Sequence, residues 1–441
     1  MSSSEAQVVQ GCSQSYRWRR ILVTTFLLLA LVVLQVDARV ALTFEELTAR
    51  GSSSSAAVRG VFSRGLEALK SAASNGRRFV ESRSSSGRTT GLLEKRTPHN
   101  KTVWISAKTY EGANFFDEWD FFTSNDPTNG LVNYVDRDTA IRNGLVYVTE
   151  EGKANMHVDN RTVLTVQEVL SRSKLRPSVR ISTKAKYNHG LYILDVAKAP
   201  YGCGTWPAYW STNSNWPNDG EIDIIENVHS SVSNQVSWHA TEGCVLTTPG
   251  NYTGTAGSTN CDARVNSNTG CGIVDPSIAS FGAAFNEKGG GVYAMKWDND
   301  SIDVWFFYRV AVPDDILQGL PDPSKWPQPS ASLSGHGCPI DKYFRDHVLI
   351  FDTTLCGDWA GTSYSTAGCP GTCEAQVADP ASFANATWSI NSIKIYNKTV
   401  INTAYLEASA PTTISSSSIF VTFFSCTLVF ALVAGFTSSV L

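Results

Sequence analysis

Short runs of alternating apolar and polar residues recur through the middle of the chain, and no long stretch of helical period interrupts them. β-branched and aromatic residues dominate these runs, which is typical of strands. Many short strands without strand–helix alternation predict an all-β sandwich. The runs are Leu145–Val148, Ser178–Ser182, Leu191–Val196, Gln235–His239, Gly291–Trp297, Ile302–Tyr308, His347–Asp352 and Trp388–Ile395, with a hairpin turn expected at Asp298–Ser301 and a short helix near Asp341–Arg345.

One stretch, Asn218–His229, combines strand composition with an unusual density of acidic groups. Glu221, Asp223 and Glu226 lie within six residues and are interleaved with isoleucines. Glu221 and Asp223 share one face of a regular strand, but Glu226 would then point into the core. Because burying an unpaired glutamate is costly, we expect a β-bulge near Ile224–Ile225 that returns Glu226 to the face of the other two carboxylates.

Three carboxylates on one face can divide protonation between them, because mutual repulsion raises the pKa of at least one. Glycoside hydrolysis needs this division, with one general acid and one nucleophile or base. The spacing alone leaves two alternatives open: a metal site, or a solvated acidic strand without chemistry. Trp206, Trp210 and Trp216, just upstream, favour a saccharide cleft, because flat aromatic side chains fit the apolar faces of sugar rings.

The segments Gly204–Trp210 and Asn215–Glu226 resemble glycoside hydrolase family 16, in its fungal laminarinase-type branch, as do Asp126–Asp136 and Phe351–Gly361. The resemblance covers roughly residues 97–400. It implies a β-jelly-roll sandwich of two curved antiparallel sheets with a concave substrate cleft. It also implies retaining hydrolysis of β-1,3 or mixed β-1,3/1,4 glucans.

The family signature Glu-x-Asp-x-x-Glu is intact in this chain. By this resemblance Glu221 is the nucleophile, Glu226 the acid/base and Asp223 the carboxylate that assists them. The positions that match substrate-binding residues are Trp206, Trp210, Trp216 and His239. We expect no cofactor and no metal in the site, a β-glucan polysaccharide as substrate, and a monomer.

Two other functions are compatible with the same resemblance. The first is transglycosylation, in which a sugar hydroxyl intercepts the covalent intermediate and cell-wall glucan is remodelled. Wall transglycosylases of the family usually carry an unbulged Glu-x-Asp-x-Glu, unlike this chain. The second is a non-catalytic β-glucan-binding protein, but such relatives have typically lost one of the glutamates. Endo-β-1,3(4)-glucanase activity is therefore the favoured interpretation.

The start of the chain has the pattern of a targeting segment. Residues 1–38 are interpreted as a signal peptide, with a basic region at Arg17–Arg20, an apolar run at Ile21–Leu34 and a cleavage site after Ala38; an uncleaved signal anchor is the alternative. Residues 39–96 are rich in Ser, Gly and Arg and poor in aromatic residues, which predicts a disordered segment or a propeptide ending at Lys95–Arg96. The catalytic domain is expected at residues 97–400.

The end of the chain predicts attachment to a surface. Residues 401–418 form a Ser/Thr-rich linker, and residues 419–441 form an apolar tail. Because stop-transfer helices usually carry basic residues on their cytoplasmic side, and none follows Lys398, a glycosylphosphatidylinositol (GPI) signal is favoured over a membrane helix. We expect the chain to follow the secretory pathway to the cell surface or cell wall.

The cysteines and the glycosylation sequons agree with a secretory route, and the net charge bears on a different question, nucleic-acid binding. Eight cysteines between Cys203 and Cys373 predict disulfides, although Cys261–Cys271 and Cys369–Cys373 have spacings that leave zinc as an alternative. A net charge of −4, without a basic run in the globular part, gives nucleic-acid binding no electrostatic support. Six Asn-x-Ser/Thr sequons fit a secreted glycoprotein, at Asn100, Asn160, Asn251, Asn299, Asn385 and Asn397.

Overall fold

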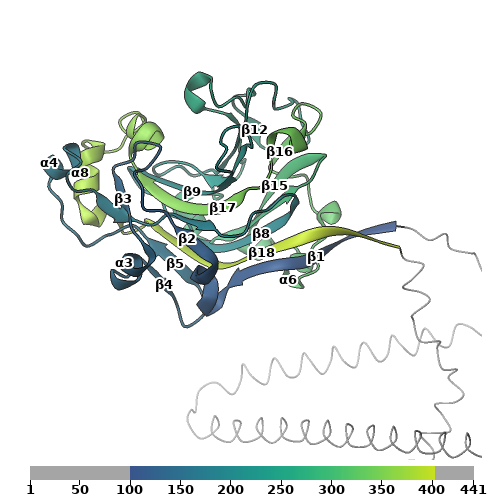
Figure 1. Ribbon diagram of the computed structural model, residues 1–441, viewed down its shortest axis with the longest axis horizontal. Helices are drawn as coiled ribbons and strands as arrows, with labels where there is room; N and C mark the ends of the chain where they lie inside the picture. Colours follow the sequence, from purple (N-terminus) through teal and green to yellow (C-terminus); the bar gives the residue numbers. More distant parts are fainter. Residues whose placement is uncertain (1–99, 403–441) are drawn as a thin grey trace, which may run out of the picture. The chain divides into compact units, whose positions relative to one another are not determined.

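The computed structural model describes residues 100–402 (Figure 1). The predicted signal peptide, the propeptide, the apolar tail and nearly all of the linker lie outside these residues. Within residues 100–402 no helix has the length and hydrophobicity needed to span a membrane.

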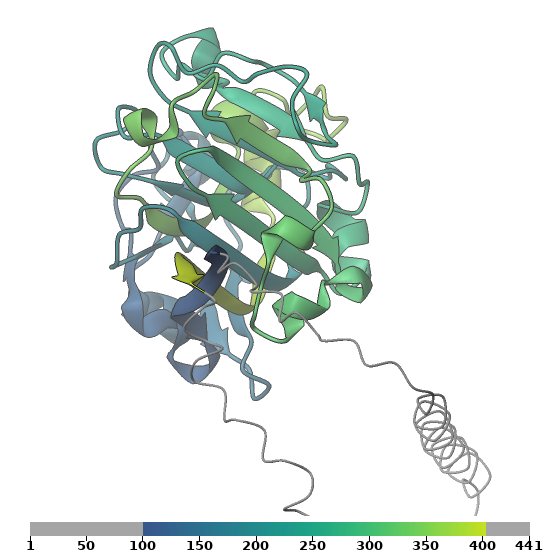
Figure 2. The ribbon, with the colours of Figure 1, turned by 90° about the vertical axis from the view of Figure 1, so that its right-hand side faces the viewer.

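Two large antiparallel sheets pack face to face, which confirms the predicted all-β sandwich (Figure 1). The outer sheet contains, in spatial order, β16 (Ala331–Ser334), β15 (Ser301–Tyr308), β14 (Gly291–Trp297), β8 (Gly190–Lys198), β18 (Thr387–Asn402), β5 (Ala154–His157) and β4 (Val146–Val148), with β1 (Asn100–Glu111) also paired to β18. Figure 2 shows the strands of this sheet running side by side across the molecule. The second sheet, called here the cleft sheet, contains β12 (Thr255–Ala256), β13 (Cys271–Val274), β11 (Gln235–His239), β10 (Glu221–Glu226), β9 (Thr205–Thr212), β17 (Val348–Leu355), β7 (Ile181–Thr183) and β2 (Trp119–Phe121).

Short elements fill the connections. A small parallel pair joins β3 (Val132–Tyr134) to β6 (Arg176–Ser178). The α-helices are α3 (Arg137–Arg142), α4 (Val166–Leu170), α5 (Gly282–Glu287), α6 (Asp314–Leu317), α7 (Ile340–Tyr343) and α8 (Cys373–Ala378). The other helical turns are η1 (Gly112–Glu118), η2 (Asn266–Asn268), η3 (Arg309–Ala311), η4 (Pro323–Lys325), η5 (Gly357–Gly361) and η6 (Pro380–Phe383). The predicted short helix near Asp341–Arg345 is α7, which begins one residue earlier.

The main core lies between the two sheets, because alternate side chains of each sheet point toward the other. Its buried members include Tyr209, Ile222, Ile225, Trp238 and Phe351 from the cleft sheet and Leu194, Met295, Trp297 and Ile393 from the outer sheet. Full burial of one such side chain stabilises the fold by about 1.5–3 kcal/mol. The opposite face of the cleft sheet is thereby left free for polar side chains.

The predicted strand runs all overlap observed strands, and the predicted hairpin joins β14 to β15, where Trp297 pairs with Ile302. Eight of the described strands were not predicted: β1, β2, β3, β5, β9, β12, β13 and β16. β9 contains Pro207, a residue that argues against a central strand because it lacks an N–H group. Pro207 is tolerated because the pairing of β9 with β10 ends at Ala208, opposite Glu226, and Pro207 lies past that last pair.

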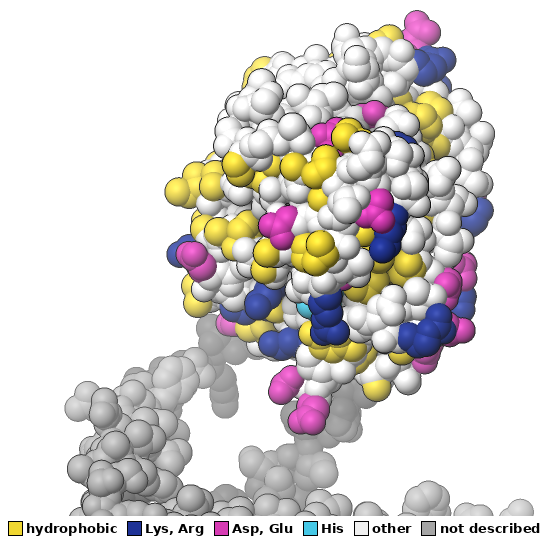
Figure 3. Space-filling model, turned by 90° about the vertical axis from the view of Figure 1, so that its left-hand side faces the viewer, with side chains coloured by type: hydrophobic (Ala, Val, Ile, Leu, Met, Phe, Trp, Pro, Cys, Tyr) yellow, Lys and Arg dark blue, Asp and Glu magenta, His cyan; other side chains and the backbone are white. Residues whose placement is uncertain are grey.

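Four disulfides confirm the prediction from the cysteine count: Cys203–Cys369, Cys244–Cys338, Cys261–Cys271 and Cys356–Cys373. The zinc alternative is wrong, because Cys261 and Cys271 are bonded to each other and Cys369 and Cys373 are each bonded to another cysteine. On the face toward α4 and α8, acidic and basic side chains are scattered among polar and apolar ones (Figure 3).

Candidate active site

The bulge predicted in β10 is present. On the β11 side, pairing runs from Glu221 to Asp223 and resumes only at Glu226; on the β9 side it shifts between Asp223 and Ile225. Ile224 and Ile225 are both buried in the core, whereas Glu221 and Glu226 remain partly exposed. The bulge therefore places both glutamates on the face away from the core, as the cost of burying a charge requires.

A histidine on the neighbouring strand lies directly opposite Glu221. His239 Nε2 is 3.3 Å from Asp223 Oδ2 and 3.9 Å from Glu221 Oε1, and Nδ1 is 2.9 Å from Asn268 Oδ1. Burial lowers the pKa of His239, but the charges of Glu221 and Asp223 outweigh burial and raise it to about 10. His239 is therefore an imidazolium that partly neutralises the acidic cluster.

The donor atoms of Glu221, Asp223 and His239 lie within 4.8 Å of one another, a spacing that a metal ion could use. Both ring nitrogens of His239 already face oxygen acceptors. The geometry favours an ion-paired acid cluster over a metal centre.

The two glutamates experience different surroundings. Burial and the Asp223 charge raise the pKa of Glu221 to about 8. The charge of His239, the side chain of Trp216 and the charge of Arg180 each oppose this shift. Burial and the same Asp223 charge hold the pKa of Glu226 well above its usual range, opposed first by a hydrogen bond with Trp206. Because His239 lies opposite Glu221 and opposes the shift there, Glu221 ionises at lower pH than Glu226, and Glu226 is the group that keeps its proton longer.

The three predicted tryptophans each lie close to a carboxylate. Trp206 Nε1 donates to Glu226 Oε1 at 2.7 Å, and Trp210 Nε1 donates to Asp352 Oδ2 at 3.2 Å. Trp216, in the loop before β10, is near enough to Glu221 to lower the pKa of that carboxyl and is 42% exposed. The structure thus brings together all seven predicted site residues: Trp206, Trp210, Trp216, Glu221, Asp223, Glu226 and His239.

Two residues of this face were not predicted from the sequence. The Arg180 guanidinium lies 4.9 Å from the Trp210 ring centre, and Nε is 3.9 Å from Asp352 Oδ2. Burial raises the pKa of Asp352 to about 7, with Arg180 opposing the shift and Asp126 adding to it. Asp352 lies within the family-like segment Phe351–Gly361, which was the one available signal. Arg180 carries no local signal, because it reaches the site only through strand pairing.

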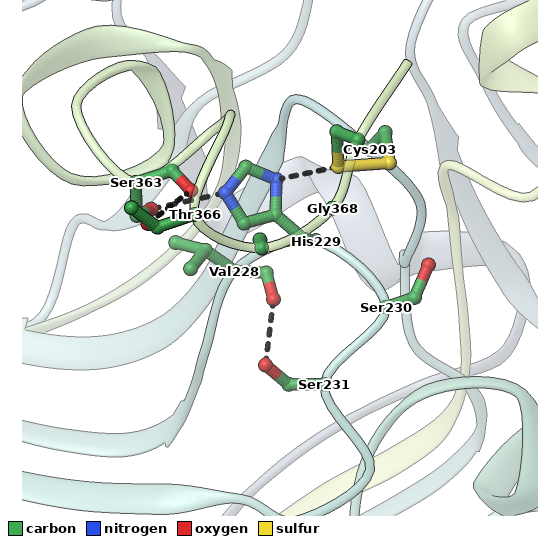
Figure 4. A pocket seen from close by; sticks show the side chains of 10 residues that line it. Cys203, Val228, His229, Ser230, Ser231, Ser363, Thr366 and Gly368 are labelled. Carbon is green, nitrogen blue, oxygen red and sulfur yellow. Dashed lines mark hydrogen bonds between the residues drawn. A yellow bond between two sulfur atoms is a disulfide. The ribbon is translucent and has the colours of Figure 1, made fainter.

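A separate pocket of about 540 Å³ lies at the end of the strand that carries Glu226 (Figure 4). None of the predicted site residues lines it. His229 is its central side chain: Nδ1 accepts from the Gly204 N–H at 3.0 Å, and Nε2 is 3.0 Å from Ser363 Oγ. Because the histidine bonds to the protein itself, it packs the Cys203–Cys369 region and is not directed at a ligand.

Comparison with protein families and curated relatives agrees with this geometry. Residues 119–396 match a family model described as "XgeA-like, catalytic GH16 domain". A probable glycosidase of Schizosaccharomyces pombe is 42% identical over 312 residues, covering 70% of this chain and 72% of that protein. A probable endo-1,3(4)-beta-glucanase of Aspergillus fumigatus is 42% identical over 300 residues, covering 66% of this chain and 45% of that protein.

Solved structures of the same family are also similar to this chain. Laminarinase 16A from Phanerochaete chrysosporium, with two β-glucans in its donor and acceptor sites, matches with a TM-score of 0.64 and 38% identity over 67% of this chain and 100% of that one. An elongating β-1,3-glucosyltransferase of the same family matches with a TM-score of 0.63 and 39% identity, also over 67% of this chain and 100% of that one. These matches confirm the predicted fold. The family match spans more than half of the sequence and includes the carboxylate strand, and the chain therefore belongs to glycoside hydrolase family 16.

Proposed function

We propose that this glycoside hydrolase is an endo-β-1,3(4)-glucanase that cleaves β-1,3 or mixed β-1,3/1,4 glucans with retention of configuration. The observation that carries the proposal is the bulged strand β10, which presents Glu221, Asp223 and Glu226 on one face in surroundings that separate their protonation states. The names of the Aspergillus relative and of the Phanerochaete laminarinase support the substrate class.

In the first step, the Glu221 carboxylate attacks the anomeric carbon of the bound glucan. Glu226 donates its proton to the glycosidic oxygen, so the bond between that oxygen and the anomeric carbon breaks and the reducing-end fragment leaves as an alcohol. The product on the enzyme is a glycosyl ester of Glu221. The positive charge of His239 stabilises the ionised nucleophile before the attack.

In the second step, the Glu226 carboxylate takes a proton from water, whose oxygen attacks the anomeric carbon and releases Glu221. The Trp206 N–H stabilises the ionised Glu226 that exists between the two steps, because it donates a hydrogen bond to the charged oxygen. Two inversions at one carbon leave the original configuration.

Substrate contact is assigned to the aromatic and polar side chains around the carboxylates. The partly exposed Trp216 offers a flat surface for a glucosyl ring. Trp210, fixed between Asp352 and the Arg180 guanidinium, offers a second surface on the same face of the sheet. The linkage that fits between these surfaces decides the preference for β-1,3 over mixed-linkage glucan.

Transglycosylation is the second candidate, and the similarity to an elongating β-1,3-glucosyltransferase favours keeping it. The same glycosyl ester would then be attacked by a sugar hydroxyl instead of water. The intact pair Glu221 and Glu226 speaks against the third alternative, a non-catalytic β-glucan-binding protein.

The purified protein should be incubated with laminarin, lichenan and cellulose while reducing ends and product masses are followed, and anomers are followed by NMR. Short oligosaccharides that first appear as the β-anomer, and their absence with Glu221→Gln, support the proposal. Glu287→Gln, an exposed glutamate in α5, is the matched control and should retain activity. Longer products without new reducing ends would indicate transglycosylation. Binding without any product, from the folded wild-type protein, would leave only recognition.

We also propose that the protein is secreted, glycosylated and held at the cell surface by a GPI anchor. Disulfides form in oxidising compartments, and the structure contains four. The sequon asparagines whose side chains the structure describes are all exposed: Asn160, Asn251, Asn299, Asn385 and Asn397. Release from intact cells by a phosphatidylinositol-specific phospholipase would support the anchor, whereas resistance to it with extraction only by detergent would point to a membrane helix.

A further inference from the structure

The bulge in β10 has two opposing effects on the strand. It turns Glu226 toward the open face, but it removes Ile224 from the pairing registers with both β9 and β11. A backbone N–H or carbonyl left without a partner in a buried strand is destabilising, because it has lost its hydrogen bonds to water. Something outside the ladder must therefore satisfy the backbone around Glu226.

The carboxamide of Asn234 does this. Its Oδ1 accepts a hydrogen bond from the Glu226 N–H at 2.9 Å, and its Nδ2 donates to the Ile224 carbonyl at 2.8 Å. The two partners fix the orientation of the amide, because one is a donor and the other an acceptor. A single side chain thus spans the bulge and restores two contacts that a regular ladder would supply.

Asn234 is itself rigidly held. It is fully buried, its N–H donates to Ser280 Oγ at 2.8 Å, and its carbonyl accepts from the Asp275 N–H at 2.8 Å. Ser280 Oγ in turn donates to the Ser277 carbonyl at 2.7 Å. The segment from Asp275 to Ser280 therefore serves as an anchor, outside the β10–β11 ladder, for the backbone of Glu226.

Glu226 is consequently fixed at both ends. Asn234 holds its backbone N–H, and Trp206 holds its carboxylate. Proton donation depends on the position of the acid to within a few tenths of an ångström, so loss of the backbone contact should misplace the acid without removing it. We propose that Asn234 is a positioning residue for Glu226, acting through the bulge; this inference rests on the proposed acid/base role of Glu226.

The test compares two substrates that differ in their need for an acid. A glucan leaving group must be protonated as it departs, whereas 2,4-dinitrophenolate leaves without a proton. The quantity to measure is kcat/KM for laminarin or lichenan oligosaccharides and for 2,4-dinitrophenyl β-laminaribioside, because this ratio reports the first bond cleavage. Asn234→Ala should lower kcat/KM for the oligosaccharides by about 100-fold and for the activated substrate by less than about 5-fold.

Asn155→Ala is the matched control. Asn155 is also a buried strand asparagine whose side chain donates to a backbone carbonyl, that of Lys153 at 3.1 Å, but it lies on β5 of the outer sheet. Its removal should affect thermal stability and leave both kcat/KM values within about 3-fold of the wild type. If Asn234→Ala does not fold, Ser280→Ala loosens the anchor without touching Glu226, and the same selective loss is expected at smaller size.

Equal losses on the two substrates, or selective loss in the Asn155 control as well, would overturn the positioning role while leaving the glucanase proposal intact. A wild-type protein that cleaves neither substrate would overturn the proposed function, and this inference with it. Selective loss in Asn234→Ala alone supports both.

Discussion

The indole nitrogen of Trp206 lies 2.7 Å from Glu226 Oε1, and the two residues belong to the neighbouring strands β9 and β10. The same ring packs edge-on against Trp359, with ring centres 5.7 Å apart. A hydrogen bond from the indole stabilises the ionised form of Glu226 and lowers its pKa.

Replacement of Trp206 by Phe should therefore raise the pKa of Glu226 further. The alkaline limb of the kcat/KM profile moves to higher pH, and hydrolysis of the glycosyl ester slows by about 10-fold, because the base is harder to ionise. pH–rate profiles and single-turnover kinetics measure the two effects. Trp326→Phe, which removes a comparable indole contact with Asp315 at 3.0 Å, should change neither.

His239→Gln should move the opposite limb. The imidazolium lowers the pKa of Glu221, so its removal raises that pKa, and the acid limb of kcat/KM shifts to higher pH. The measurement is the pH profile of kcat/KM between about pH 3 and 10. An unchanged acid limb would mean that His239 does not act on the nucleophile. His189→Gln, which loses an exposed contact with Asp341, is the control.

Glu221→Gln should change how stability depends on pH. Burial raises the pKa of Glu221 from 4.5 in the unfolded chain to about 8, so the folded state binds the proton more tightly. The stabilisation from this group is complete below the lower value and is lost as pH rises through the higher one. The Gln variant lacks this loss. The melting temperature of the variant minus that of the wild type should therefore increase as the pH is raised from about 4.5 to about 8. Parallel melting curves for the two proteins would contradict the raised pKa.

Gly220→Ala should destabilise the fold and reduce activity. Gly220 has φ +79°, and an added Cβ would lie 2.5 Å from the Tyr343 carbonyl oxygen, so the residue next to Glu221 must shift. We expect a loss of about 2 kcal/mol or more in the free energy of unfolding. Gly319 has a similar φ of +71° but open space around it, so Gly319→Ala isolates the backbone strain from the clash. Equal losses in the two variants would show that the clash is relieved.

Removal of the Cys203–Cys369 disulfide should lower stability by about 2–5 kcal/mol, because it joins residues 166 apart in sequence. The Cys261–Cys271 disulfide spans only 10 residues, so its removal should cost less. Chemical denaturation of the two double Cys→Ser variants compares them. The opposite order would show that local packing outweighs chain entropy.

The bulge could be predicted from the sequence because its causes are local. Ile222, Ile224 and Ile225 require a buried face, and the charge of Glu226 cannot share it. The tryptophans could be found for the same reason, since they lie close to the carboxylates along the chain. The strand composition was sufficient to predict the sandwich.

The rest of the site depends on strand order, which local pattern does not encode. Arg180 meets Asp352 because β7, β17 and β9 are neighbours in one sheet. Asn234 shows its role only once the register of β10 and β11 exposes the unpaired backbone at Ile224. The disulfide partners were undetermined for the same reason, because an even count of cysteines predicts bonding without choosing the pairs.

The β1–β18 ladder has a topological consequence. Asn100 and Asn402 are its outermost pair, so the first and last residues of the described domain lie side by side, about 5 Å apart as in any antiparallel ladder. A short linker could close this domain into a ring, and new ends could be opened at the exposed turn Asn299–Asp300, between β14 and β15. Such a circular permutant would leave every strand of the cleft sheet uncut and would carry its fusion partners on a different edge of the enzyme.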